Sequence, residues 1–299
     1  MKVGYKSRGI VLKLLVIALI FFIAGCRAKE GLVPAESGPL KIYTTFYPLY
    51  DFTKKIVGDR AVVENLQPAG VEPHDYEPSP RQIASIYSGK LFIFLGEPMD
   101  AWAKKIEGQL QEKGVVTLEA GQGLIENNDP HIWLDPLLAR EIARRIFEAV
   151  ATVDGDNKSY YEKNYHELDK KFAMLDREYR DTLNAVTRRD IVTSHAAFGY
   201  LARRYGLNQI PISGLSPQQE PSAQQMAELI TLCRSKGVKY IFFETLASPK
   251  LAEALAREAG AGTLVLNPIG GLTKEEMEAS EDYFSIMAKN LAALKKALE

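Results

Sequence analysis

The sequence predicts an α/β protein with two lobes, each built on a mostly parallel sheet flanked by helices, and one long helix that joins them. Short apolar runs such as Leu91–Leu95 and Lys239–Phe243 alternate with helical patterns in both halves, which favours parallel strands with helical crossovers. Between the halves, Asn157–Val186 holds apolar residues at helical spacing without a proline or glycine. A chain of 299 residues can bury a substantial core.

The first 39 residues have the composition of an export signal followed by a tether. A basic leader precedes Leu14–Ile23, an apolar run too short for the ~20 residues that span a bilayer, so residues 1–25 are predicted to be a signal peptide. The run ends in Ile-Ala-Gly-Cys, which resembles the lipobox of bacterial lipoproteins and predicts lipidation of Cys26. The alternatives to a lipoprotein signal are an uncleaved membrane anchor and a signal that a peptidase cleaves after a small residue. Residues 26–39 are expected to tether an extracytoplasmic protein to the cell membrane.

Residues 40–153 are predicted to form the first lobe. Apolar patterns predict strands at residues 40–46, 61–66, 91–95 and 115–118, and helices at 48–57, 80–87, 97–110 and 136–151. Ser79 and Asp135 each precede a proline and are expected to cap the helices that begin there. His74 lies in a polar, proline-rich loop after the second strand, and His131 lies between two prolines that stiffen its backbone.

Residues 154–188 are predicted to connect the lobes. A helix over residues 157–186 is about 45 Å long at 1.5 Å per residue. Its apolar stripe is expected to pack on both lobes, as a rigid spine rather than a hinge, and Asp154 or Asp156 is expected to cap its start. His166 lies among charged residues of this helix and is expected to be an exposed histidine rather than a ligand.

Residues 189–299 are predicted to form the second lobe with the same alternation. Strands are predicted at residues 190–193, 208–212, 239–243 and 263–266, and helices at about 198–205, 221–235, from 249 onward and at 283–298. Thr273 and Glu276 have the spacing of a capping box. His195 directly follows the first of these strands, while Glu244 and Asn267 follow the last two.

Composition excludes several classes of protein. The formal net charge is −1 and no part of the chain beyond the extreme N-terminus concentrates Lys and Arg, so a nucleic-acid partner is not expected. Two cysteines exclude a disulfide framework and a Cys-rich zinc module.

Three of the four histidines, His74, His131 and His195, are predicted to bind one metal ion between the lobes. Ligands of open α/β sheets bind at the carboxyl ends of strands, where the loops that hold these histidines begin. The alternatives are a solvated loop histidine at position 74 and a helix-capping histidine at position 195. Glu244 and Asn267 end neighbouring strands and could serve as an oxygen ligand or as an acceptor behind a ligand.

The chain resembles the metal-binding lipoproteins of bacterial ABC importers for zinc and manganese, known as the cluster 9 family of solute-binding proteins. The matching stretches are Pro73–Pro80 (PHDYEPSP), His131–Pro136 (HIWLDP), Thr193–Tyr200 (TSHAAFGY) and Leu266–Pro268 (LNP). The resemblance implies two α/β lobes linked by one long helix, with the metal in the cleft bound by the three histidines. It also implies a protein that is not an enzyme, is expected to be a monomer, and delivers its ion to a membrane permease.

One position departs from the family. Many members have an Asp, the fourth ligand, where this chain has Asn267, and some supply a Glu where this chain has Gly270. The fourth donor therefore stays open among Asn267, another carboxylate such as Glu244, and water. Manganese-selective members commonly have Glu where this chain has His195.

Three neutral imidazoles suit zinc, copper or nickel, and bioavailability and the family resemblance favour zinc over copper. Mn²⁺ prefers carboxylates and is the runner-up. Because ligating imidazoles must be neutral, affinity is expected to fall as the pH drops through ~6.5. A secreted zinc hydrolase is the first competing class, but the sequence lacks a His-Glu-x-x-His helix pair. A surface adhesin is the second.

Overall fold

The structure is a computed structural model that describes residues 39–299, so the predicted signal peptide and Cys26 lie outside the described residues. Two four-stranded sheets, with orders β2-β1-β3-β4 and β6-β5-β7-β8, organise this part of the chain. Every pair of neighbouring strands is parallel, which confirms the predicted fold class. The strands are β1 (Leu40–Thr44), β2 (Ala61–Asn65), β3 (Leu91–Phe94), β4 (Val116–Glu119), β5 (Asp190–Thr193), β6 (Asn208–Pro211), β7 (Tyr240–Phe243) and β8 (Gly262–Val265).

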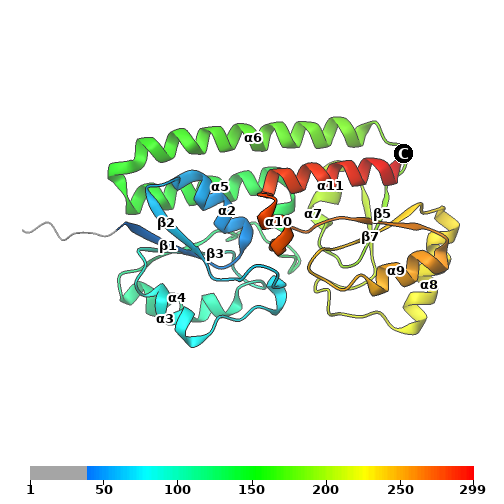
Figure 1. The fold of residues 1–299 in the computed structure, drawn as a ribbon, viewed down its shortest axis with the longest axis horizontal. Helices are drawn as coiled ribbons and strands as arrows, with labels where there is room; N and C mark the ends of the chain where they lie inside the picture. The colour runs from blue at the N-terminus through cyan, green and yellow to red at the C-terminus, as the bar shows by residue number, and fades with distance from the viewer. Residues whose placement is uncertain (1–38) are drawn as a thin grey trace, which may run out of the picture. The chain divides into compact units, whose positions relative to one another are not determined.

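Helices cover both faces of each sheet. They are α2 (Tyr47–Val57), α3 (Pro80–Ile86), α4 (Ala101–Glu112), α5 (Pro136–Val153), α6 (Lys158–Asn184), α7 (Gly199–Tyr205), α8 (Ala223–Lys236), α9 (Lys250–Ala259), α10 (Lys274–Glu278) and α11 (Tyr283–Leu298), with short 3₁₀ turns η1 (Pro73–Asp75), η2 (Ile132–Leu134) and η3 (Gly155–Asn157). Figure 1 shows α6 along one side of residues 39–299, next to α5, α2 and α11, whereas α3, α4, α8 and α9 lie on the other side of the sheets.

Alternating side chains of the strands divide the core by face. Ile42 of β1 packs with the α2, α5, α6 and α11 layer, whereas its neighbour Tyr43 packs with α3 and α4 on the opposite face. All four residues of β3 are buried, as expected for a central parallel strand covered on both faces. On the second sheet, Val192 and Ile241 pack against α8 and α9.

The long helix α6 packs on elements from both halves of the chain, as predicted. Its fully buried Phe172 makes edge-to-face contacts with Phe52 of α2 and Tyr283 of α11, at 5.2 and 5.7 Å between ring centroids. Two helical turns further on, Tyr179 donates a hydrogen bond to the carbonyl of Met287 at 2.7 Å. The connection is therefore held by side-chain packing along its length and not only at its ends.

Most helix boundaries agree with the prediction, with a clear difference at α4. The sequence pattern places its start at residue 97, but the helix begins at Ala101. The reason is a tertiary bond: the buried Asp100 carboxylate accepts hydrogen bonds from the Leu95 backbone and the Thr45 hydroxyl, at 2.6 and 2.9 Å, which holds residues 96–100 in a turn. Asp135 caps α5 as predicted, by accepting from the backbone of Leu137 and Leu138.

Two expected helix starts differ in detail. Helix α6 begins after the 3₁₀ turn η3, and Asp154 accepts from the side chains of Asn157 and Tyr161 rather than from the first backbone groups of the helix. Ser222, not the preceding proline, starts α8 through a capping box. Within residues 39–299, no helix combines the length and apolar character needed to cross a bilayer.

Candidate metal centre

The imidazoles of His74, His131 and His195 lie together, with one ring nitrogen from each within 4.8 Å of the other two. His131 is central, because its Nε2 lies 3.1 Å from Nε2 of His74 and 3.3 Å from Nε2 of His195. Both lobes contribute, since the first two histidines follow strands of the first sheet and His195 follows β5. In the part of the chain that the structure describes, no other group of His, Cys, Asp and Glu has this arrangement.

Hydrogen bonds to both lobes hold the His131 segment. Oδ1 of Asp129 accepts from the backbone nitrogen and from ring Nδ1 of His131, at 3.1 and 2.8 Å. Two residues later, Nε1 of Trp133 donates to the carbonyl of Pro268 at 2.7 Å, and the Trp133 carbonyl accepts from the hydroxyl of Tyr283 at 2.6 Å. Because Pro268 and Tyr283 come from the second half of the chain, His131 is fixed relative to both sheets.

His195 lies at the point where the strand order of the second sheet reverses, between β5 and β7. Glu244 follows β7, and its Oε1 accepts from Nδ1 of His195 at 2.6 Å and from the hydroxyl of Ser194. The next helix, α7, begins at Gly199 with Phe198 as its N-cap. The alternative in which His195 only caps that helix is therefore wrong.

His74 is the least enclosed of the three histidines. It is partly buried, whereas His131 and His195 are each 1% exposed. His74 lies in the 3₁₀ turn η1, and its backbone nitrogen donates a long hydrogen bond, 3.4 Å, to the carboxylate of Glu72. The neighbouring Asp75 accepts a hydrogen bond from Gln218 of the second lobe. Elsewhere in the loop, the hydroxyl of Tyr76 donates to the carbonyl of Leu66 at 2.6 Å, and the backbone nitrogen of Gly70 donates to the carbonyl of Leu272 in the second lobe at 2.8 Å. The His74 ring itself, unlike the rings of His131 and His195, has no carboxylate partner within residues 39–299.

The hydrogen bonds at Nδ1 orient two of the three rings. When Nδ1–H of His131 donates to Asp129 and Nδ1–H of His195 donates to Glu244, each Nε2 presents a lone pair to the centre. Zn–N bonds of 2.0–2.1 Å in a tetrahedron place neighbouring nitrogens about 3.3–3.4 Å apart. The observed Nε2 separations of 3.1 and 3.3 Å match that spacing. The three nitrogens therefore suit one tetrahedral transition-metal ion.

Comparison with known proteins gives the family. Residues 42–297 match the family model described as "Zinc-uptake complex component A periplasmic". The chain belongs to this family. It is 42% identical to the high-affinity zinc uptake system protein ZnuA of Bacillus subtilis, over 95% of this chain and 97% of that protein.

Solved structures agree with this assignment. The Zn(II)-bound ZnuA-like domain of Streptococcus pneumoniae AdcA superimposes with a TM-score of 0.80 at 43% identity, covering 87% of this chain and 99% of that domain. The full AdcA protein is longer, and this chain spans 59% of it at 39% identity, over 94% of this chain. The laminin-binding protein Lmb of Streptococcus agalactiae has a TM-score of 0.79 at 34% identity, over 88% of this chain and 100% of that chain.

Membership of the zinc-uptake family decides between the broad classes considered from sequence. Members are solute-binding components of an importer and not enzymes, so the secreted-hydrolase alternative is wrong. They work outside the cytoplasm with an ABC permease as partner, and zinc is favoured over manganese as the ion they carry.

Burial favours the neutral form of His74 and of His131 in this zinc-uptake protein. Removal from water, together with the nearby His131 and His195 rings, lowers the pKa of His74 to about 3. Burial also lowers the pKa of His131, although its bond to Asp129 opposes that effect. Burial raises the pKa of Glu72 to about 7, partly opposed by the bond from the His74 amide. The lowered pKa values predict that, at these two rings, protons compete with a metal ion only below the pH of about 6.5 expected for an ordinary histidine.

Of the oxygen donors considered from sequence, that of Asn267 and Oε1 of Glu244 are hydrogen-bonded, whereas Oε2 of Glu244 is buried without a hydrogen-bond partner among the described residues. The side-chain oxygen of Asn267 accepts from the backbone of Ile269 at 2.7 Å, and its amide nitrogen donates to Thr245 and Glu276. Asn267 therefore holds the turn after β8. The Glu244 carboxylate lies on the Nδ1 side of His195, away from the Nε2 lone pair, so it orients this ring rather than sharing its ion.

Two residues of the centre were not assigned a role from sequence. Asp129 orients His131, and Glu72 lies beside His74. Each is a carboxylate two residues before a histidine, but that spacing is too common to indicate a ring contact by itself. His166, the fourth histidine, is exposed on α6, as predicted.

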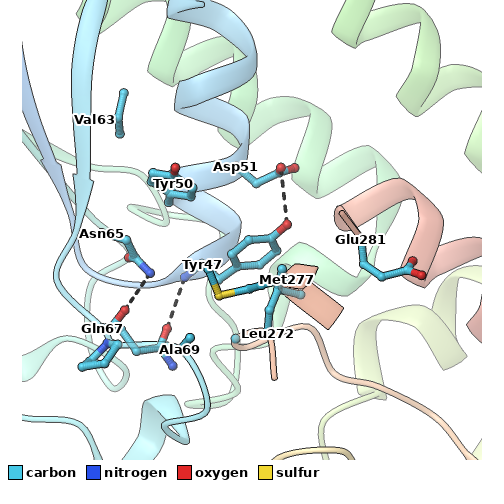
Figure 2. A pocket seen from close by; sticks show the side chains of 12 residues that line it. Tyr47, Tyr50, Asp51, Val63, Asn65, Gln67, Ala69, Leu272, Met277 and Glu281 are labelled. Carbon is cyan, nitrogen blue, oxygen red and sulfur yellow. Dashed lines mark hydrogen bonds between the residues drawn. The ribbon is translucent and has the colours of Figure 1, made fainter. Parts of the chain in front are cut away.

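A cavity of about 530 Å³ lies outside the group of three histidines, and Figure 2 shows the side chains that line it. Tyr47 and Asp51 of α2 face Leu272 and Met277 across it. The hydroxyl of Tyr47 donates to Asp51 at 3.5 Å, and Lys55 pairs with the same carboxylate. Oδ2 of Asp51 is buried without a hydrogen-bond partner among the described residues, and none of the three histidines lines the cavity.

Proposed function

We propose that this protein captures Zn²⁺ outside the cytoplasm through His74, His131 and His195 and delivers it to the permease of an ABC importer. The main support for the proposal is the convergence of three imidazoles from both lobes, in which Nε2 of His131 lies at the spacing of a tetrahedral zinc site from Nε2 of His74 and from Nε2 of His195. The names of the relatives support zinc as the ion, since ZnuA and the AdcA domain are described as zinc proteins.

Capture is proposed to depend on a small closing movement that brings the His74 loop against His131 and His195. The His131 segment already bonds to Pro268 and Tyr283 of the second lobe, and the His74 loop bonds to that lobe through Asp75 with Gln218 and Gly70 with Leu272, so a large rotation of the lobes would break these bonds. An ion that binds only when all three imidazoles converge shifts the population towards the closed loop. The permease then distinguishes loaded from unloaded protein by the shape of that surface.

The direct test is metal selectivity of the full-length protein. In competition with a chromophoric chelator at neutral pH, we expect one Zn²⁺ per chain and binding of Mn²⁺ that is weaker by several orders of magnitude, because Mn²⁺ prefers a carboxylate-rich shell. Metal analysis of protein purified without chelator gives an independent reading. Preferential binding of Mn²⁺, or no zinc in either measurement, would contradict the proposal.

The pH dependence of zinc affinity is expected to be shallow. Only neutral imidazoles bind the ion, and a lowered pKa keeps His74 and His131 neutral as the pH falls. Three histidines with ordinary pKa values would make the logarithm of affinity fall with a slope approaching about three per pH unit below ~6.5. We expect a slope clearly below three between pH 6.5 and 5, because fewer than three imidazoles gain a proton over that range. A zinc titration at several pH values measures it, and a slope near three would contradict the burial of these rings.

We also propose how the rest of the chain is organised, from the export signal to the boundaries of the two lobes. Residues 1–25 are a signal peptide, Cys26 carries a lipid, residues 26–39 form a tether, and the mature protein is a monomer. Residues 40–153 and 189–299 form the lobes, with residues 154–188 between them. Fractionation of cells that produce a Cys26→Ala variant tests the anchor: the variant should leave the membrane fraction, and its retention there would contradict lipidation.

An adhesin role has one observation in its favour. Lmb, which has a similar fold, is described as bifunctional, with adhesin and metal-transporting activity. If this chain shares that activity, binding to laminin should survive replacement of all three histidines by Ala. Absence of laminin binding by the intact protein would dismiss this second function.

A further inference from the structure

The three imidazoles leave one place in the coordination shell of a tetrahedral ion. Zinc sites with three histidines hold a fourth donor, from the protein or from water. An inference about that donor rests on the proposed function, because it presumes that His74, His131 and His195 bind zinc. The fourth donor must be a side chain of this protein that can reach the ion, or water.

The turn that follows β8 does not provide this donor. The Asn267 oxygen is bound to the backbone of Ile269, and the carbonyl of Pro268 is bound to Trp133. Ile269 has a positive φ of 57°, which is rare for a β-branched residue, so these bonds hold the turn in an unusual conformation. At Gly270 an added Cβ would lie 2.6 Å from Cγ of Pro73, so a side chain there would displace the His74 loop.

Glu72 belongs to the same loop as Pro73, which it directly precedes, and lies two residues before His74. Its side chain is partly buried, and its carboxylate rests on the backbone nitrogen of His74 through a bond of 3.4 Å, near the limit for a hydrogen bond. The carboxylate is outside the group of nitrogens that lie within 4.8 Å of one another, so ligation requires a side-chain rotation.

We propose that Glu72 supplies the fourth donor to the bound zinc, by turning its carboxylate from the His74 amide towards the three Nε2 atoms. The bond that it leaves is long, so little stabilisation is lost on rotation. An anionic oxygen binds Zn²⁺ more strongly than water does, and it joins the loop that carries His74 to the ion by a second bond. Closure of the loop and completion of the shell then occur in one step.

A structural role for Glu72 predicts a different outcome from a ligand role. As the N-cap of the 3₁₀ turn η1, Glu72 stabilises the loop by accepting the His74 amide proton. The Glu72→Gln variant keeps a side-chain oxygen for that bond but loses the anionic donor. Glu77→Gln is the matched control, because Glu77 lies exposed in the same loop and loses the same charge.

The experiment measures zinc affinity and the visible spectrum of the Co²⁺-loaded protein, using full-length wild type and both variants. We expect Glu72→Gln to weaken zinc binding by about 10- to 100-fold and to change the d–d bands of Co²⁺, while Glu77→Gln changes neither. Unchanged affinity overturns the proposal, and so does weaker binding with an unchanged Co²⁺ spectrum, which would indicate the capping role alone. If the wild-type protein binds no zinc, or binds it without His131, the proposed function fails instead.

Discussion

Replacing His131 by Ala is expected to weaken zinc binding by more than about 100-fold, since even changes behind the ligands of a metal site weaken binding 10- to 100-fold. The effect should exceed that at either other histidine. Nε2 of His131 is the atom that lies within 3.1 Å of His74 and 3.3 Å of His195, so its loss removes the centre of the arrangement. Chelator competition with purified full-length variants measures the change.

The matched control is His166→Ala, which removes the remaining histidine from an exposed position on α6. Its zinc affinity should equal that of the wild type. Far-UV circular dichroism of both variants shows whether the fold is retained, because loss of His131 also leaves Asp129 without its ring partner. A His131→Ala variant that is folded and binds zinc like the His166→Ala variant would remove the basis for the proposed centre.

The convergence of the three histidines could be predicted from sequence because it depends on topology. Parallel strands end at one edge of each sheet, so the residues that follow β2, β4 and β5 must come near that edge wherever the intervening helices lie. The partners of the rings could not be predicted in the same way. Whether Glu244 binds an ion or orients His195 depends on which ring nitrogen it meets, and this is decided by side-chain rotamers across two strands.

The fold also has features that neighbouring residues predict and features that depend on tertiary contacts. Strand positions follow from short apolar runs, and helix starts such as Asp135 follow from local capping, so both are encoded in neighbouring residues. The start of α4 is not, because the carboxylate of Asp100 binds a hydroxyl 55 positions earlier in the chain. The role of Asn267 likewise depends on Glu276 and Asn290, whose side chains meet it only in the folded protein.

Replacing Phe172 by Ala is expected to destabilise the folded protein by about 3–5 kcal/mol, the usual loss for a large aromatic residue removed from a core. Phe172 is fully buried, and its ring contacts Phe52 of α2, Tyr283 of α11 and Phe284 of α11. The variant loses these contacts and gains a cavity where α6 holds both halves of the chain together. Urea denaturation of the zinc-free protein measures the change in the free energy of unfolding.

Met174→Ala is the control on the same helix, since Met174 is 58% exposed and its replacement should change stability by less than about 0.5 kcal/mol. The zinc affinity of the Phe172→Ala variant distinguishes a rigid α6 from an α6 that acts as a hinge. A rigid spine acts only through the stability of the fold, so Phe172→Ala should bind zinc at 25 °C within a few-fold of wild type as long as it is folded. If α6 were a hinge whose bending governs capture, loosening its packing would change zinc affinity at least as strongly as stability, and that result would contradict the assignment.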